Sequence, residues 1–120
     1  LFGLISKQNN KLVWKTAIEA TLINGWTGFL LCSKNGLGQI WLRGIIKPGT
    51  LSFGTDVIQQ LPTDFQSANA YNSPLEAWLD SGECQAGLTF MYEGKIKVYL
   101  PLAGSAKTQN FHINKVIKIA

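Results

Sequence analysis

The sequence predicts an all-β domain, an antiparallel sandwich or barrel of the jelly-roll or knob-like type, with at most one short helix. Several short stretches alternate apolar and polar residues, and glycine, proline or asparagine separates each from the next. Only one stretch carries helix signals. The chain has 120 residues, of which 46% are hydrophobic and 15% are charged, and this suits a single compact core.

Predicted strands in the first half of the chain are residues 22–26, 39–44 and 58–62. Around the second of these, alternation places Ile40, Leu42, Gly44 and Ile46 on one face of the strand and Trp41, Arg43 and Ile45 on the other. One face of such a strand is expected to be buried, and the other is expected to be wet.

The second half of the chain predicts a hairpin and a final strand. Residues 88–92 and 95–100 form the hairpin, which turns at Gly94, where a positive φ costs little. In the final strand one face is apolar except at Lys115, and its residues are Phe111, Ile113, Ile117 and Ile119. Residues 74–79 predict the one short helix, with Ser73 as its cap and Pro74 in its first turn.

The domain organisation follows from the start of the chain. Residues 1–11 are predicted to be a linker from a preceding region, and residues 12–120 the folded head domain, because the chain opens on Leu1 rather than methionine. The opening residues lack the basic region and long apolar stretch of a signal peptide. No apolar run approaches the ~20 residues that span a bilayer. We therefore expect a soluble domain without membrane insertion.

Cysteines and charge give little functional signal. Cys32 and Cys84 are expected to be free thiols, and Cys32 lies in an apolar run where a thiol acts as a small hydrophobe. The formal net charge of +4 comes from scattered residues, although lysines become frequent toward the C-terminus. A basic face could meet nucleic acid or an anionic wall polymer, but the solvated side of two strands explains it more simply.

The residues that catalysis needs do not assemble into a recognised motif. His112 is the sole histidine, and a zinc site would require both cysteines, which lack the spacing of ligand pairs. No phosphate-binding glycine motif is present. Glycosidases need two carboxylates at a set separation, and any chain with seven carboxylates could satisfy that by chance. A Cys–His nucleophile pair stays open but has no local support. We expect no enzymatic activity, no cofactor and no metal.

Aromatic residues indicate carbohydrate recognition instead, because a flat ring covers the apolar face of a sugar while neighbouring polar groups bond its hydroxyls. Trp14 and Trp26 are expected to pack beside the first strands. The candidate saccharide-binding residues are Trp78, Tyr71, Asp80, His112, Arg43 and Trp41. For His112, a simple solvated position on the polar face of its strand is the alternative.

In the order of these elements the chain resembles the C-terminal head domains of tailed-bacteriophage tail fibres and receptor-binding proteins, including the baseplate adhesin heads of lactococcal phages. The matching pieces cover most of the chain from residue 12 onward, and they are residues 22–26, 29–34, 40–46, 49–58, 61–65 and the hairpin through Gly94.

This resemblance implies a non-enzymatic head that binds a bacterial cell-wall saccharide or teichoic acid as a homotrimer. It also implies attachment to a tail fibre or baseplate at the tail tip of the virion, after assembly in the host cytoplasm. Saccharide pockets of the lactococcal heads use a Trp, His, Asp and Arg cluster late in the domain. In this chain His112 follows Gly87, but no Trp, Asp or Arg does. The site positions of the lactococcal heads therefore cannot be assigned to residues of this sequence.

Two other functions remain open at this point. One is an unrelated carbohydrate-binding or protein-interaction module of jelly-roll type. The other is a basic barrel that binds single-stranded nucleic acid, since Trp41 beside Arg43 and Tyr99 beside Lys97 place aromatic and basic groups together.

Overall fold

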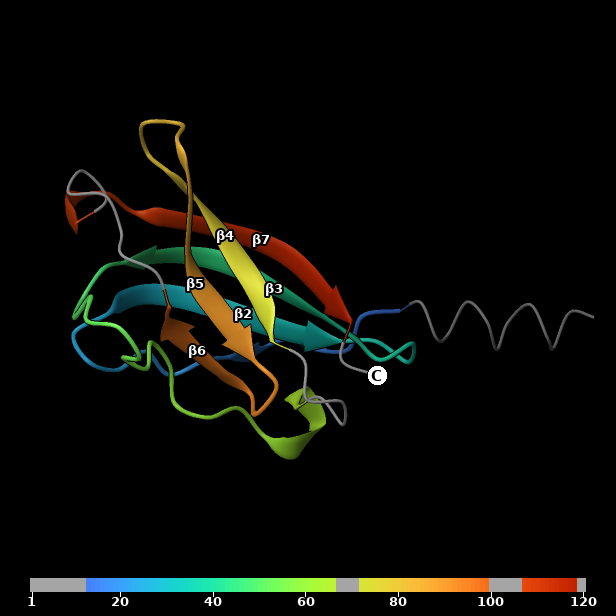
Figure 1. Cartoon of the computed structure of the whole chain (residues 1–120). Coiled ribbons are helices and arrows are strands. Elements are labelled where there is room, and N and C mark those ends of the chain that lie inside the picture. Colours follow the sequence, from blue (N-terminus) through green and yellow to red (C-terminus); the bar gives the residue numbers. More distant parts are fainter. Residues whose placement is uncertain (1–12, 67–71, 100–106, 119–120) are drawn as a thin grey trace, which may run out of the picture.

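The structure is a computed structural model that describes residues 13–66, 72–99 and 107–118. These residues form one curled antiparallel sheet with the strand order β1-β2-β3-β7-β4-β5-β6 (Figure 1). The strands are β1 (Ile18–Glu19), β2 (Thr27–Lys34), β3 (Gln39–Lys47), β4 (Ser73–Leu79), β5 (Cys84–Met91), β6 (Lys95–Val98) and β7 (Phe111–Lys118). One 3-10 turn, Thr63–Phe65, is the sole helical element among the described residues. The predicted all-β fold class is thus confirmed.

The segment 52–61 closes the open side of the curled sheet. Its Val57 N–H donates to Ile96 O of β6 at 2.7 Å, while Val57 O accepts from Ile23 N–H at 3.0 Å. On the same segment Gln59 N–H donates to Thr21 O at 2.9 Å. One connecting segment is thereby bonded both to the edge strand β6 and to the residues that follow the edge strand β1, which satisfies main-chain groups that would otherwise be left unpaired.

Two of the predicted strands, 22–26 and 58–62, are wrong as regular strands. They meet only at an isolated bridge between Leu22 and Ile58. Asn24 and Gly25 adopt φ values of 55° and 83°, which turn the chain after Leu22 and end any strand there. The alternation of apolar and polar residues cannot show how far a strand is paired. Here the two segments pair with each other at one position only.

The core fills the inside of the curl, and its residues come from every long strand and from the closing segment. Alternation along β3 and β7 was predicted correctly, since Ile40, Leu42 and Ile46 are buried on β3 and Phe111, Ile113 and Ile117 on β7. Trp26 is buried as expected and meets Phe111 edge-on, with ring centroids 5.6 Å apart. The predicted hairpin is also confirmed, with a φ of 82° at Gly94 between β5 and β6.

The helix predicted over residues 74–79 is wrong, because these residues form β4. Leu75, Ala77 and Leu79 are buried and alternate with exposed residues, which is the period of a strand. β4 pairs with β5 along its length and with β7 at its end, so tertiary pairing outweighs the weak helix signals of Ser73 and Pro74. The linker over residues 1–11, Leu100 and Ile119 lie outside the described residues.

Both cysteines are free, as predicted, and their environments differ. Burial raises the pKa of the Cys32 thiol to about 12, whereas Cys84 is exposed at the start of β5. We expect one thiol per folded chain to react with a thiol-specific disulfide reagent at pH 8, and two after unfolding, because the thiolate is the reacting form. Two rapidly reacting thiols in the folded chain would contradict this assignment.

Candidate functional site

On the outer face of the sheet, one residue from each of four neighbouring strands lies in a row that crosses the strands. Phe29 on β2 faces Ile45 on β3, Ile45 faces His112 on β7, and His112 faces Trp78 on β4. Because successive side chains of a strand alternate between faces, this row points away from the core. Trp78 is 57% exposed, and Phe29 and Ile45 are 44% and 37% exposed. An exposed band of apolar and aromatic groups thus crosses the sheet.

At one end of this row, three candidate residues come together. His112 Nε2 lies 2.8 Å from Asp80 Oδ1, and the main-chain N–H of Asn110 donates to Asp80 Oδ2 at 3.0 Å. Trp78 is the direct strand partner of His112. We call Trp78, Asp80 and His112 the Trp78 cluster. Residues 32 positions apart in the sequence meet here because β4 and β7 pair only at this end.

The Asp80 position is fixed by the turn that follows β4. Leu79 N–H donates to Glu83 O at 2.8 Å and Gly82 N–H donates to Leu79 O at 2.9 Å, so the chain reverses directly after the strand. Gly82 has a φ of 89°, which favours glycine in this turn. The turn holds the Asp80 carboxylate against the start of β7, where it meets Asn110 and His112.

Hydrogen bonds from His112 and from the Asn110 N–H lower the pKa of Asp80 below its usual value of 3.8. The carboxylate is therefore charged at neutral pH and held in a set orientation. A charged acceptor, an imidazole and a neighbouring indole can bind the hydroxyls and the apolar face of a sugar ring together.

This lowered pKa has a consequence for stability in acid. A group whose pKa is lower in the folded state stabilises the fold above its unfolded pKa, and that contribution is lost as the pH falls through the folded value. We expect Asp80→Asn to lower the melting temperature at neutral pH, and this difference to shrink below pH 3.8. Melting curves from pH 7 to pH 2 measure it, and a difference independent of pH would contradict the assignment.

Trp41 and Arg43 form a separate group on the same outer face. The Arg43 guanidinium lies 4.0 Å from the centroid of the Trp41 ring and donates to Ser33 Oγ at 3.0 Å. Trp41 Nε1 donates to Asn114 Oδ1 at 2.7 Å. Trp14 adds a second indole at 5.7 Å from Trp41, so the expectation that it packs is met. These contacts hold the pair rigidly, which is typical of a structural stack.

The six predicted site residues thus divide in space. Trp78, Asp80 and His112 make one cluster, Trp41 and Arg43 make a stack further along the strands, and Tyr71 lies outside the described residues. Sequence reasoning missed Asn110, whose main-chain N–H orients Asp80, and Phe29, which extends the exposed row. Alternation within β2 could have indicated that Phe29 points outward, but no local signal places it in register with Trp78.

Across residues 13–66, 72–99 and 107–118, no three His, Cys, Asp or Glu side chains lie close enough to hold a metal ion together. Within these same ranges, no helix has the length and apolar character needed to cross a membrane.

Known proteins match this chain through structure and not through sequence. No protein family model matches it, and no curated protein matches it in sequence. A solved structure, the receptor binding protein of Listeria phage PSA, superposes with a TM-score of 0.62 over 98% of this chain and 74% of the phage protein, at 18% identity. The two proteins share a fold. This likeness agrees with the resemblance to phage receptor-binding heads expected from the sequence.

Proposed function

We propose that this domain is the receptor-binding head of a tailed bacteriophage, located at the tail tip of the virion. The observation that carries the proposal is the fold shared with the Listeria phage receptor binding protein over nearly the whole chain. Attachment to a tail fibre or baseplate and adhesion to the bacterial surface belong to the same proposal. Such a head acts by binding alone and leaves its ligand chemically unchanged.

The ligand in this proposal is a saccharide of the bacterial cell wall, such as a teichoic-acid sugar. The Trp78 cluster supports it, since an exposed indole stands beside an oriented carboxylate and an imidazole. One such site binds weakly, at about 4 kcal/mol for a millimolar dissociation constant. Several heads that engage the wall together raise the strength of attachment without any new contact.

Binding of the purified, fluorescently labelled domain to isolated cell walls tests this function. We expect walls of a host strain to retain the domain, and periodate oxidation of the wall sugars to abolish retention. Retention that survives periodate and disappears after protease treatment would show a protein partner instead. A steep loss with added salt, together with retention on single-stranded DNA, would favour the nucleic-acid alternative.

We also propose that the head assembles as a homotrimer through the outer face of β2, β3 and β7. Phe29, Ile45 and Val116 are 44%, 37% and 49% exposed there, and burying such groups between copies would remove apolar surface from water. The cluster around Trp78 would then lie at the rim of the interface, because its row is continuous with Ile45.

Light scattering should give a mass near three times the 13.2 kDa of one chain. Val116→Glu should return the mass to that of one chain, because it places a charge in the proposed interface. A matched substitution away from β2, β3 and β7, Phe53→Glu, should leave the trimer intact, since Phe53 is 73% exposed on the segment bonded to β6. A monomeric wild-type chain would contradict the proposed assembly.

A further inference from the structure

A hollow lies beside β4, away from the Trp78 cluster. It has a volume of about 390 Å³ and is lined by Asn72, Pro74, residues 86–89 and Tyr99. Small-molecule sites are typically hollows of roughly this size or larger, with mostly apolar walls and a few polar groups. Of the described residues that line this hollow, none is charged.

An irregularity in strand pairing shapes the floor of the hollow. Leu75 of β4 pairs with Leu88 and Glu76 pairs with Ala86, so Gly87 is an extra residue without a partner on β4. Such bulges bend a strand and redirect the neighbouring side chains. Because Ala86 and Gly87 have little or no side chain, the main chain of β5 itself forms the floor. Ala86 is exposed and Gly87 is buried, so the small Ala86 side chain leaves the hollow open above this part of β5.

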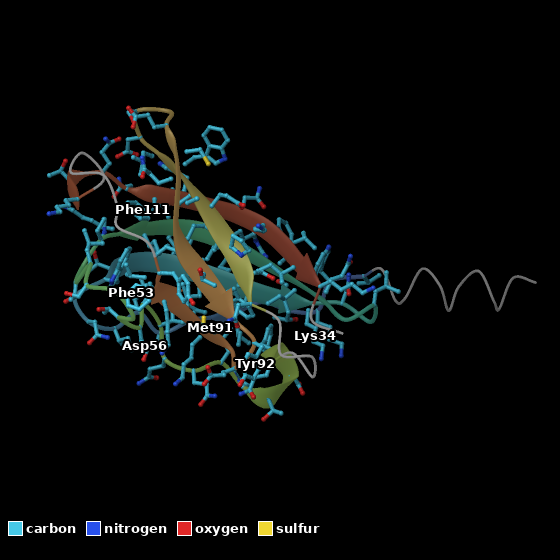
Figure 2. All side chains as sticks on the ribbon, viewed as in Figure 1. Lys34, Phe53, Asp56, Met91, Tyr92 and Phe111 are labelled. Atoms are coloured by element: carbon cyan, nitrogen blue, oxygen red, sulfur yellow. The ribbon has the colours of Figure 1, made fainter. Side chains whose placement is uncertain are left out.

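An aromatic wall stands over this floor. Tyr99 N–H donates to Gly87 O at 2.8 Å, which anchors Tyr99 beside the bulge. Its ring is 46% exposed and lies 5.3 Å from the ring of Phe53, tilted by 47°. Phe53 is held close by the bond from Gly54 N–H to Val98 O at 2.7 Å. Figure 2 shows Phe53 and Asp56 on the segment that runs beside β6.

Polar groups stand at the other side of the hollow. Asn72 Oδ1 accepts the main-chain N–H of Tyr92 at 3.1 Å, which fixes the side-chain amide and leaves its nitrogen as a donor. Thr89, the strand partner of Pro74, adds a hydroxyl that can donate and accept. An exposed ring, an oriented amide and a hydroxyl around an uncharged hollow match the chemistry of a neutral sugar ring.

We infer that this hollow is a second saccharide subsite that takes an uncharged sugar ring against Tyr99. The inference rests on the proposed function, and it adds a site that the Trp78 cluster does not explain. Pro74 and Trp78 both point outward from β4 and are four residues apart, which corresponds to about 13 Å along a strand. One domain would therefore contact a wall glycan at two separated points on the same side of β4.

Amide chemical shifts of the isotope-labelled domain test the subsite directly. The probes are the methyl glycosides of glucose, galactose, rhamnose and N-acetylglucosamine, titrated one at a time. At least one of them should shift the amides of Gly87, Leu88 and Thr89. Tyr99→Ala should weaken that response about tenfold, as expected for the loss of one aromatic contact, whereas Tyr99→Phe should keep it.

Leu37→Ala is the control, because Leu37 is 43% exposed in the turn between β2 and β3 and does not line the hollow. It should leave the response unchanged. If none of the four glycosides shifts the residues of the hollow, or if Tyr99→Ala responds like the wild type, the inference is overturned. Amide shifts of Trp78 and His112 in the same titrations report sugar binding at the Trp78 cluster. Failure of the second subsite can therefore be told apart from failure of the proposed function.

Discussion

Gly28→Ala is expected to destabilise the fold by about 3 kcal/mol or more, because no side chain fits at this position. Gly28 lies in β2 with a φ of 110°, and a Cβ there would stand 2.2 Å from Ile45 O and 3.0 Å from the Cα of Ile46. Both obstacles are backbone atoms of the paired strand β3, so they cannot rotate away. Relief would require β2 and β3 to separate at the end of their ladder, where Gly28 pairs with Ile46.

Urea unfolding of the variant and of a matched control measures this cost. Gly54 serves as the control, because its φ of 81° is also unfavourable for alanine but a Cβ there meets nothing within 4 Å. Gly54→Ala should therefore cost only about 1–2 kcal/mol from its backbone conformation. Equal losses for the two variants would show that the close approach of β2 and β3 is not what requires glycine at position 28.

Trp78→Ala is expected to remove most of the adhesion of the domain to bacterial walls while leaving the fold intact. The side chain is 57% exposed, so its removal should change the free energy of unfolding by no more than about 0.5 kcal/mol. Loss of the ring from one sugar contact weakens a single site about tenfold. In the proposed trimer, which would bind through several sites, the apparent affinity should fall by about a hundredfold or more.

Wall-retention assays with the wild type, Trp78→Ala and Tyr92→Ala separate a site effect from a general surface effect. Tyr92 is a second exposed aromatic residue outside the Trp78 cluster, and its removal should leave retention unchanged. Unfolding curves of all three proteins show whether each is folded. Full retention of a folded Trp78→Ala variant would exclude the Trp78 cluster as the principal binding site.

Part of the candidate site was within reach of sequence reasoning. The exposure of Trp78 and the nearness of Asp80 to it follow from a polar turn directly after an apolar stretch. Contact between Asp80 and His112 does not, because it depends on pairing between β4 and β7, and the two residues are 32 positions apart in the sequence. For the same reason the sequence did not predict that Trp78 and Asp80 meet His112. The fold brings them together from β4, the turn after it, and β7.

Period-two alternation by itself determined the class of this fold and the buried faces of β3 and β7, because a strand with one wet side needs every second residue to be apolar. Only the tertiary structure decided that residues 73–79 are a strand, since their helix signals are weaker than pairing with β5 and β7. It also decided the register that places Phe29, Ile45, His112 and Trp78 in one row. Register depends on hydrogen bonds between distant segments, and those are absent from any local pattern.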